Sequence, residues 1–209
     1  MKNRQIVTAV FGAIAPAILL FAVDVIVGDN ELFMLINRNA VNPVLDFTCV
    51  YLSPVLFSVF YITVLLGLFF SMNGTSTATG ILSIVNGVLS YAAGSLIKLL
   101  VMKPRPEIAV ASRTIGLWNT GTFSFPSTLT MLAFGLSLPI LMDKRRAGII
   151  LVALSYFMGF SVIYTGYHFP VDVSAGIAFA SVLSLCTNGV KKPLAAFIKK
   201  HKSKGELFR

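Results

Sequence analysis

Two basic side chains and one candidate helix start could bind a phosphate group. Lys98 and Arg105 both lie in the segment KLLVMKPRP, and an arginine side chain can hold two phosphate oxygens at once. Ser127 and Thr128 follow Pro126 in the segment FSFPST, where the proline predicts the beginning of a helix. The free backbone N–H groups at a helix start attract an anion. Lys98, Arg105, Ser127 and Thr128 are therefore our candidates for phosphate binding.

A histidine and an aspartate supply the reactive part of the pattern. His168 and Asp172 are four positions apart in the segment YTGYHFPVD, so on a helix they would share one face. A neutral imidazole can attack phosphorus, and a carboxylate can fix the tautomer of the ring and stabilise the cation that forms. This set predicts phosphoryl transfer with His168 and Asp172 as the catalytic pair.

The elements that must position these residues are membrane helices, as the composition indicates. Of the 209 residues, 56% are hydrophobic and 12% are charged, whereas soluble domains carry about a quarter charged residues. A membrane span needs about 20 largely apolar residues. Stretches that reach or approach this length are 6–27, 47–70, 78–102, 126–142, 147–164 and 170–187. We therefore predict an all-α polytopic membrane protein, with six transmembrane helices in one bundle and a single domain over residues 1–209.

The connections between the spans differ in character. Residues 31–47, ELFMLINRNAVNPVLDF, are amphipathic and too short to cross a membrane, which predicts a helix along the interface. Residues 103–125 form the longest connection, and long loops in compact folds are often functional. We interpret Lys103 and Arg113 as solvated charges of this loop. The aromatic residues near the ends of the spans are interpreted as interfacial anchors, namely Trp118, Tyr164 and Tyr167.

Basic residues in short loops predict the orientation. The positive-inside rule places Lys2, Arg4, the run 144–146 and the tail 191–209 in the cytoplasm. Six spans put all of these segments on one side. Both termini are thus expected in the cytoplasm and the candidate site on the outer face, most simply of the plasma membrane. A basic tail after the last span is typical of a membrane surface, so we expect no nucleic-acid partner.

The ordered segments resemble the motifs of the type 2 phosphatidic acid phosphatase family, membrane enzymes that dephosphorylate lipid phosphates and polyprenyl pyrophosphates. The first family motif is Lys, six residues and Arg-Pro; the second is Pro-Ser-Gly-His; the third is Ser-Arg, five residues, His, three residues and Asp. The matching positions are Lys98, Arg105, Pro106, Pro126, Ser127, Ser161, His168 and Asp172. The resemblance covers most of the chain.

Three positions depart from the family pattern. Leu129 stands where the second motif has its histidine, Thr128 stands where it has glycine, and Val162 stands where the third motif has arginine. In the family, the histidine that corresponds to His168 is the nucleophile. The second-motif histidine protonates the leaving group, and no residue has that role here. Losing a general acid typically lowers a rate by about 10²–10⁴-fold, and the loss should matter less when the leaving group is itself a phosphate.

The resemblance implies an integral-membrane phosphatase or phosphotransferase that acts on a lipid phosphate or polyprenyl pyrophosphate through a phosphorylated His168. Lys98, Arg105 and Ser127 would bind the phosphate, Asp172 would orient the imidazole, and no cofactor or metal is implied. The alternative is a catalytically inactive member that binds or transports a phosphorylated lipid, which Leu129 and Val162 favour. The sequence leaves this choice, the phosphoryl acceptor and the oligomeric state open.

Overall fold

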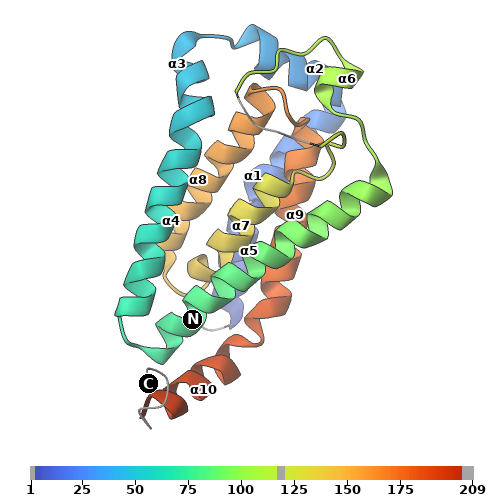
Figure 1. Cartoon of the computed structure of the whole chain (residues 1–209). Coiled ribbons are helices and arrows are strands. Elements are labelled where there is room, and N and C mark those ends of the chain that lie inside the picture. The colour runs from blue at the N-terminus through green and yellow to red at the C-terminus, as the bar shows by residue number, and fades with distance from the viewer. Residues whose placement is uncertain (1–2, 117–120, 204–209) are drawn as a thin grey trace.

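Helices make up nearly all of the computed structural model, which describes residues 3–116 and 121–203 (Figure 1). In chain order the elements are α1 Asn3–Val27, α2 Asp29–Met34, η1 Leu35–Asn39, α3 Pro43–Phe47, η2 Thr48–Leu52, α4 Ser53–Phe70, α5 Gly74–Val101, α6 Pro106–Ala109, α7 Thr128–Leu141, α8 Arg145–Tyr164, α9 Pro170–Asn188 and α10 Lys191–Ser203. The segments η1 and η2 are π-helical. Within the described residues the extended pairing is limited to one isolated bridge between Pro104 and Phe123. The prediction of an all-α fold is confirmed.

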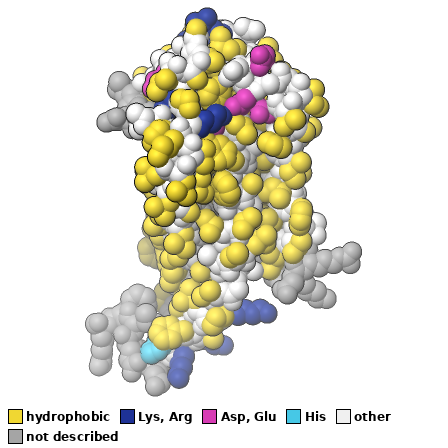
Figure 2. Space-filling view, turned by 90° about the vertical axis from the view of Figure 1, so that its right-hand side faces the viewer, with side chains coloured by type: hydrophobic (Ala, Val, Ile, Leu, Met, Phe, Trp, Pro, Cys, Tyr) yellow, Lys and Arg dark blue, Asp and Glu magenta, His cyan; other side chains and the backbone are white. Residues whose placement is uncertain are grey.

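Five helical stretches are long and apolar enough to cross a membrane: Ile6–Val27, Pro43–Phe70, Gly74–Val101, Arg145–Tyr164 and Pro170–Asn188. A sixth apolar helix, α7, is shorter. Hydrophobic side chains cover the middle of the face shown in Figure 2, whereas the charged side chains gather at its two ends. This distribution suits a hydrocarbon layer between two polar surfaces. The chain is therefore an integral, polytopic membrane protein, as predicted.

The short helix α7 lies at the centre of the bundle, in contact with α5, α8 and α9. It has 14 residues, so at 1.5 Å per residue it extends about 21 Å, less than the roughly 30 Å of a hydrocarbon core. It begins later than the predicted stretch 126–142 because the Ser127 hydroxyl caps it by accepting from Thr130 N. At its start, Ser127 and Thr130 are both fully buried. The start of α7 therefore lies inside the protein and not at its surface.

The connection between the first two spans is helical in three pieces. Helix α2 lies across one end of the bundle (Figure 1) and buries Leu32 and Phe33, while Glu31 stays exposed. The π-helical segment η1 follows it. The third piece, α3, belongs to the second span, because the apolar stretch runs from Pro43 through to Phe70. The predicted interfacial segment 31–47 is thus shorter than expected.

The basic tail forms an amphipathic helix, α10. Ile198 is buried, whereas Phe197 and Lys199 are exposed. A Cβ atom added to Gly74 would lie 3.1 Å from the Ala195 carbonyl oxygen, so the start of α5 contacts α10 backbone to backbone. The start of α1 and helix α10 lie at the same end of the bundle, which an even number of crossings requires (Figure 1).

We expect Glu107 on α6 to face the outside of the cell and Lys199 on α10 to face the cytoplasm, because the basic segments surround the α10 end. Both side chains are exposed. In a variant whose free cysteines Cys49 and Cys186 are replaced, Glu107→Cys should react with an impermeant maleimide in intact cells. Lys199→Cys should react only after the membrane is opened. The reverse pattern would show that the orientation is wrong.

Candidate active site

A tight turn between α8 and α9 directs His168 into the bundle. The backbone N–H groups of Tyr167 and His168 both donate to the carbonyl oxygen of Val162, at 3.0 and 3.1 Å. Gly166 has a φ of +91°, and a Cβ atom there would collide with the Arg113 carbonyl oxygen. Only glycine fits such a position without strain. The turn consequently folds back on the end of α8, and His168 is buried.

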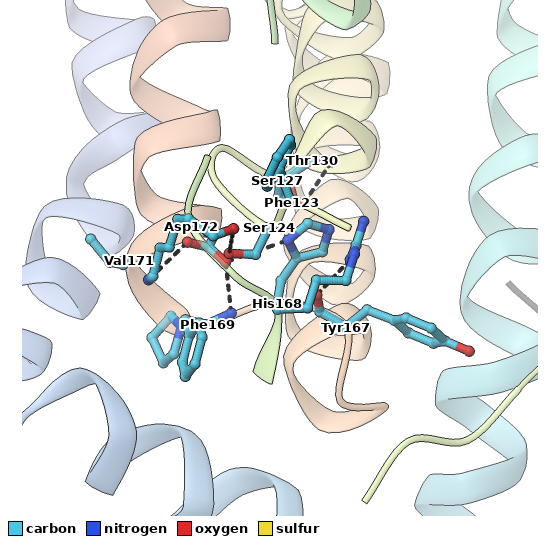
Figure 3. Close-up of polar contacts among 12 residues, drawn as sticks. Phe123, Ser124, Ser127, Thr130, Tyr167, His168, Phe169, Val171 and Asp172 are labelled. Atoms are coloured by element: carbon cyan, nitrogen blue, oxygen red, sulfur yellow. Dashed lines mark hydrogen bonds and ion pairs between the residues drawn. The ribbon is translucent and has the colours of Figure 1, made fainter. Parts of the chain in front are cut away.

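The start of α9 brings Asp172 next to this histidine. Its Oδ2 accepts a hydrogen bond of 2.9 Å from the backbone N–H of Phe169, which caps the helix. The same oxygen lies 3.5 Å from Nδ1 of His168, and Figure 3 shows the two side chains facing each other. The two groups are close but not hydrogen-bonded, because Nδ1 has no hydrogen-bond partner in the described part of the chain. The nitrogen on the other side of the ring, Nε2, is the one that could react.

Two buried or half-buried cations surround the pair. Lys98, near the end of α5, donates to the carbonyl oxygens of Phe123 and Ser124 at 3.0 and 2.8 Å. Arg105 donates from Nη1 to the carbonyl oxygen of Tyr167 at 2.7 Å. Its Nε donates to a backbone carbonyl oxygen of the same loop whose carbonyls bind Lys98. Among residues 3–116 and 121–203, no cluster of His, Cys, Asp and Glu could hold a metal ion. Lys98 and Arg105 both bring positive charge close to His168.

The start of α7 is tied to the same place. The backbone N–H of Ser127 donates to the carbonyl oxygen of Asp172 at 3.0 Å, and its hydroxyl accepts from the Thr130 hydroxyl at 2.9 Å (Figure 3). The methyl group of Thr128 lies against Gly94 of α5. The structure thus brings Lys98, Arg105, Ser127, His168 and Asp172 together from three separate segments. Phosphate binding by the candidate residues, Thr128 included, stays a prediction.

The burial of His168 changes its protonation. Removal from water is the main cause that lowers its pKa from 6.5 to about 4, and the nearby charges of Lys98 and Arg105 act in the same direction. Asp172 opposes this shift. The imidazole is therefore neutral at neutral pH, the form that can attack an electrophile.

We expect an NMR titration of the ring nitrogens to show His168 unprotonated down to about pH 5. The variant His201→Gln leaves one histidine signal, since the chain has two histidines. Between about pH 4 and 6.5 the unfolded chain binds more protons than the folded chain, because the folded pKa is the lower one. The free energy of unfolding should consequently fall as the pH falls through this window. A midpoint near 6.5 would mean that the ring is solvated and that the pocket is not as described.

The interpretation of two loop cations as solvated charges is wrong. Lys103 lies 2.6 Å from Oδ2 of Asp29 and 3.1 Å from Oδ1 of Asp172. Arg113 forms an ion pair with Asp46. The loop folds back over α2 and the start of α9, and this path could not be derived from the sequence, because Asp29 and Lys103 are 74 positions apart.

The interfacial interpretation of two tyrosines is wrong as well. Tyr164 is fully buried, and its hydroxyl donates to Oδ1 of Asp46 at 2.6 Å. Tyr167 is 5% exposed, and its hydroxyl donates to the Gly116 carbonyl oxygen at 3.0 Å. Tyr167 thus joins the long loop to the turn after α8, whereas Tyr164 joins the end of α8 to α3. Trp118 lies outside the described residues.

Two of the unusual positions noted in the sequence are neighbours. Leu129, in the first turn of α7, and Val162, near the end of α8, line one small cavity of about 10 Å³ together with Cys49 and Met158. This volume is at most enough for one water molecule. His168 does not line this cavity, although its backbone N–H binds the carbonyl oxygen of Val162. An apolar pair therefore lies beside the turn that carries the histidine.

Several known proteins are similar to this chain in sequence or in structure. Residues 76–192 match the family model described as the PAP2 superfamily. The undecaprenyl-diphosphatase BcrC of Bacillus subtilis (strain 168) is 30% identical over 142 residues, which cover 68% of this chain and 72% of that protein. The bacitracin transport permease protein BcrC of Bacillus licheniformis is 39% identical over 61 residues, 29% of this chain and 30% of that protein. The crystal structure of Aquifex aeolicus LpxE is similar with a TM-score of 0.55 and 26% identity, over 76% of this chain and 93% of that chain.

Proposed function

Because the chain belongs to the PAP2 superfamily, we propose that it is a membrane lipid phosphatase whose nucleophile is His168 and whose preferred substrate is a polyprenyl diphosphate. One observation carries the proposal: a neutral, buried histidine faces a buried aspartate beside two cations from distant parts of the chain. The similarity to an undecaprenyl-diphosphatase supports the substrate class. The site would open to the outer face, at the end of the bundle away from α10.

Phosphate binding would come from Lys98, Arg105 and the start of α7. An ammonium group has three N–H donors and a guanidinium has five, so each can keep its backbone hydrogen bonds and still donate to phosphate oxygens. The N-terminal end of α7 adds the positive end of its helix dipole. These donors would neutralise charge that develops on the phosphoryl oxygens during the reaction.

In the first step, Nε2 of His168 would attack the terminal phosphorus. A P–N bond forms, the bond from this phosphorus to the bridging oxygen breaks, and the lipid monophosphate leaves with the electron pair. Asp172 lies at Nδ1, where it would stabilise the positive charge on the imidazole.

In the second step, water would attack the phosphorylated histidine. A P–O bond forms, the P–N bond breaks with its electron pair returning to Nε2, and the water proton ends on phosphate or solvent. Transfer to another acceptor would make the chain a phosphotransferase with the same first step. Inorganic phosphate as a product distinguishes hydrolysis from that reaction.

The alternative is an inactive member that binds a phosphorylated lipid, and the apolar pair Leu129 and Val162 favours it. The experiment that decides is phosphate release by purified protein from farnesyl diphosphate and from farnesyl phosphate. We expect release from the diphosphate and little from the monophosphate. Binding of both lipids without release, dependent on Lys98 and Arg105, would establish the alternative.

A further inference from the structure

We propose that Lys103, held by Asp29, is a positioning residue for the catalytic aspartate Asp172. This inference rests on the proposed function and adds two residues that lie outside the motifs of the candidate site. It assigns a role to the corner between α1 and α2, which otherwise contributes nothing to the reaction.

The contacts form a continuous chain of charges. Nζ of Lys103 lies 3.1 Å from Oδ1 of Asp172, while the other carboxylate oxygen, Oδ2, accepts from Phe169 N and faces His168. The two oxygens of Asp172 thus have different partners. The lysine fixes the orientation of the carboxylate that the histidine faces.

Asp29 completes this arrangement from the other side. Its Oδ2 lies 2.6 Å from Nζ of Lys103, and its Oδ1 accepts at 3.3 Å from the backbone N–H of Val171, in the first turn of α9. Asp29 is the first residue of α2. The first turn of α2 is consequently joined to the first turn of α9, which carries Asp172.

The surroundings of Lys103 favour positioning over direct binding of phosphate. Two carboxylates already lie within ion-pair distance of its single charge. Its ammonium group also lies 4.2 Å from the centroid of the Phe169 ring, a cation–π contact. A phosphate would have to displace these partners, whereas the hydrogen bonds that Lys98 and Arg105 make to described residues go to backbone carbonyls.

The burial of Asp172 explains why a counter-charge is needed. Its side chain is fully buried, and a buried carboxylate is costly unless it is paired and hydrogen-bonded. Without the lysine, one oxygen of Asp172 would lose its charged partner. The carboxylate could then rotate away from His168 or take up a proton, and either change would weaken its support of the imidazolium.

The test is turnover of farnesyl diphosphate by Lys103→Met, Lys103→Arg, Asp29→Asn and the double variant with Lys103→Met and Asp29→Asn. Removing a residue that orients a catalytic group typically lowers activity by about 10–100-fold. We expect Lys103→Met to lower kcat by this factor with KM changed less than about threefold, and Lys103→Arg to recover most of it. The double variant should be no slower than Lys103→Met, because the two residues act in one chain. Lys192→Met, an exposed lysine on α10, is the matched control for loss of one positive charge.

Three results would overturn the inference. An unchanged kcat in Lys103→Met would show that the lysine positions nothing. A rise in KM at constant kcat would show that it binds the substrate phosphate instead. Independent, multiplying effects of Lys103→Met and Asp29→Asn would show that they do not act together. If His168→Ala is as active as the wild type, the proposed function itself fails and takes the inference with it, which separates the two failures.

Discussion

The variant His168→Ala is expected to lose phosphate release from farnesyl diphosphate by more than about 10⁴-fold. Knocking out the nucleophile of a catalytic set removes nearly all of the rate enhancement that the set provides. No second imidazole could replace it. The chain has two histidines, and the other one, His201, lies on α10 at the far end of the bundle (Figure 1). The measurement is the single-turnover rate with purified protein in detergent or nanodiscs.

The matched control is His201→Ala, which should keep the wild-type rate. A second readout follows the proposed intermediate. Brief mixing with a diphosphate labelled at the terminal phosphorus should leave an acid-labile, alkali-stable label on the wild type and on His201→Ala, and none on His168→Ala. Equal phosphate release from His168→Ala and the wild type would rule out His168 as the nucleophile. Release without any label would leave a direct attack of water, with His168 as its base, as the mechanism.

Much of the fold could be predicted from the sequence because the signal is strong and local. Apolar stretches of membrane-spanning length recur along the chain, and the composition is not that of a soluble domain. The errors lie where tertiary contacts decide. The segment 43–47 joins the second span rather than the interface, and α7 is cut short by the cap at Ser127. A serine after a proline indicates a helix start, but not that this start is buried inside the bundle.

The residues of the candidate site also fall into those that the local sequence predicts and those that depend on tertiary contacts. The spacing of residues within short segments predicts Lys98, Arg105, His168 and Asp172 as candidate site residues, because each segment forms a local structural element. The interpretation of Lys103 as a solvated charge is wrong, since its carboxylate partners cannot be identified from a polar loop sequence.

The carboxylate partners of Lys103 come from two other segments of the chain. They are separated from it by 74 and 69 positions, and no periodicity connects them. The interpretation of Tyr164 as an interfacial aromatic is wrong for the same reason. A tyrosine at a helix end suits a membrane interface, but here the loop and Asp46 cover the side chain.

The positions Leu129 and Val162 acquire a meaning that the sequence could not provide. They line the same cavity, so two of the three residues that differ from the family pattern are neighbours in space. Two apolar side chains pack against each other at little cost, whereas one charged residue facing one apolar residue would be buried without a partner. The pair therefore has to be tested jointly as well as singly.

The second large effect concerns the leaving group. We expect the wild type to release phosphate from farnesyl diphosphate about 10²–10⁴-fold faster than from farnesyl phosphate, the range that a general acid typically contributes. A lipid monophosphate departs readily as an anion, whereas an alkoxide must receive a proton. A series of aryl phosphates with falling leaving-group pKa should close the gap gradually. Equal rates for both farnesyl substrates would show that some residue of the chain already protonates the leaving group.

Introducing the absent acid should reduce this preference. In Leu129→His with Thr128→Gly, which makes room beside α5, we expect monophosphate hydrolysis to rise by at least about 10-fold while diphosphate hydrolysis changes little. The new imidazole would face Val162, whose carbonyl oxygen binds the backbone of His168, so it would enter the site from the side of the turn. Leu129→Gln with Thr128→Gly is the matched control, because an amide can donate a hydrogen bond but cannot transfer a proton. Adding Val162→Arg should mainly lower KM, because an arginine supplies positive charge but no acid. The size of this effect should depend on the residue at position 129, because the two side chains share one cavity. If the histidine and glutamine variants raise monophosphate turnover equally, polarity and not proton donation limits the wild type, and the diphosphate preference needs another cause.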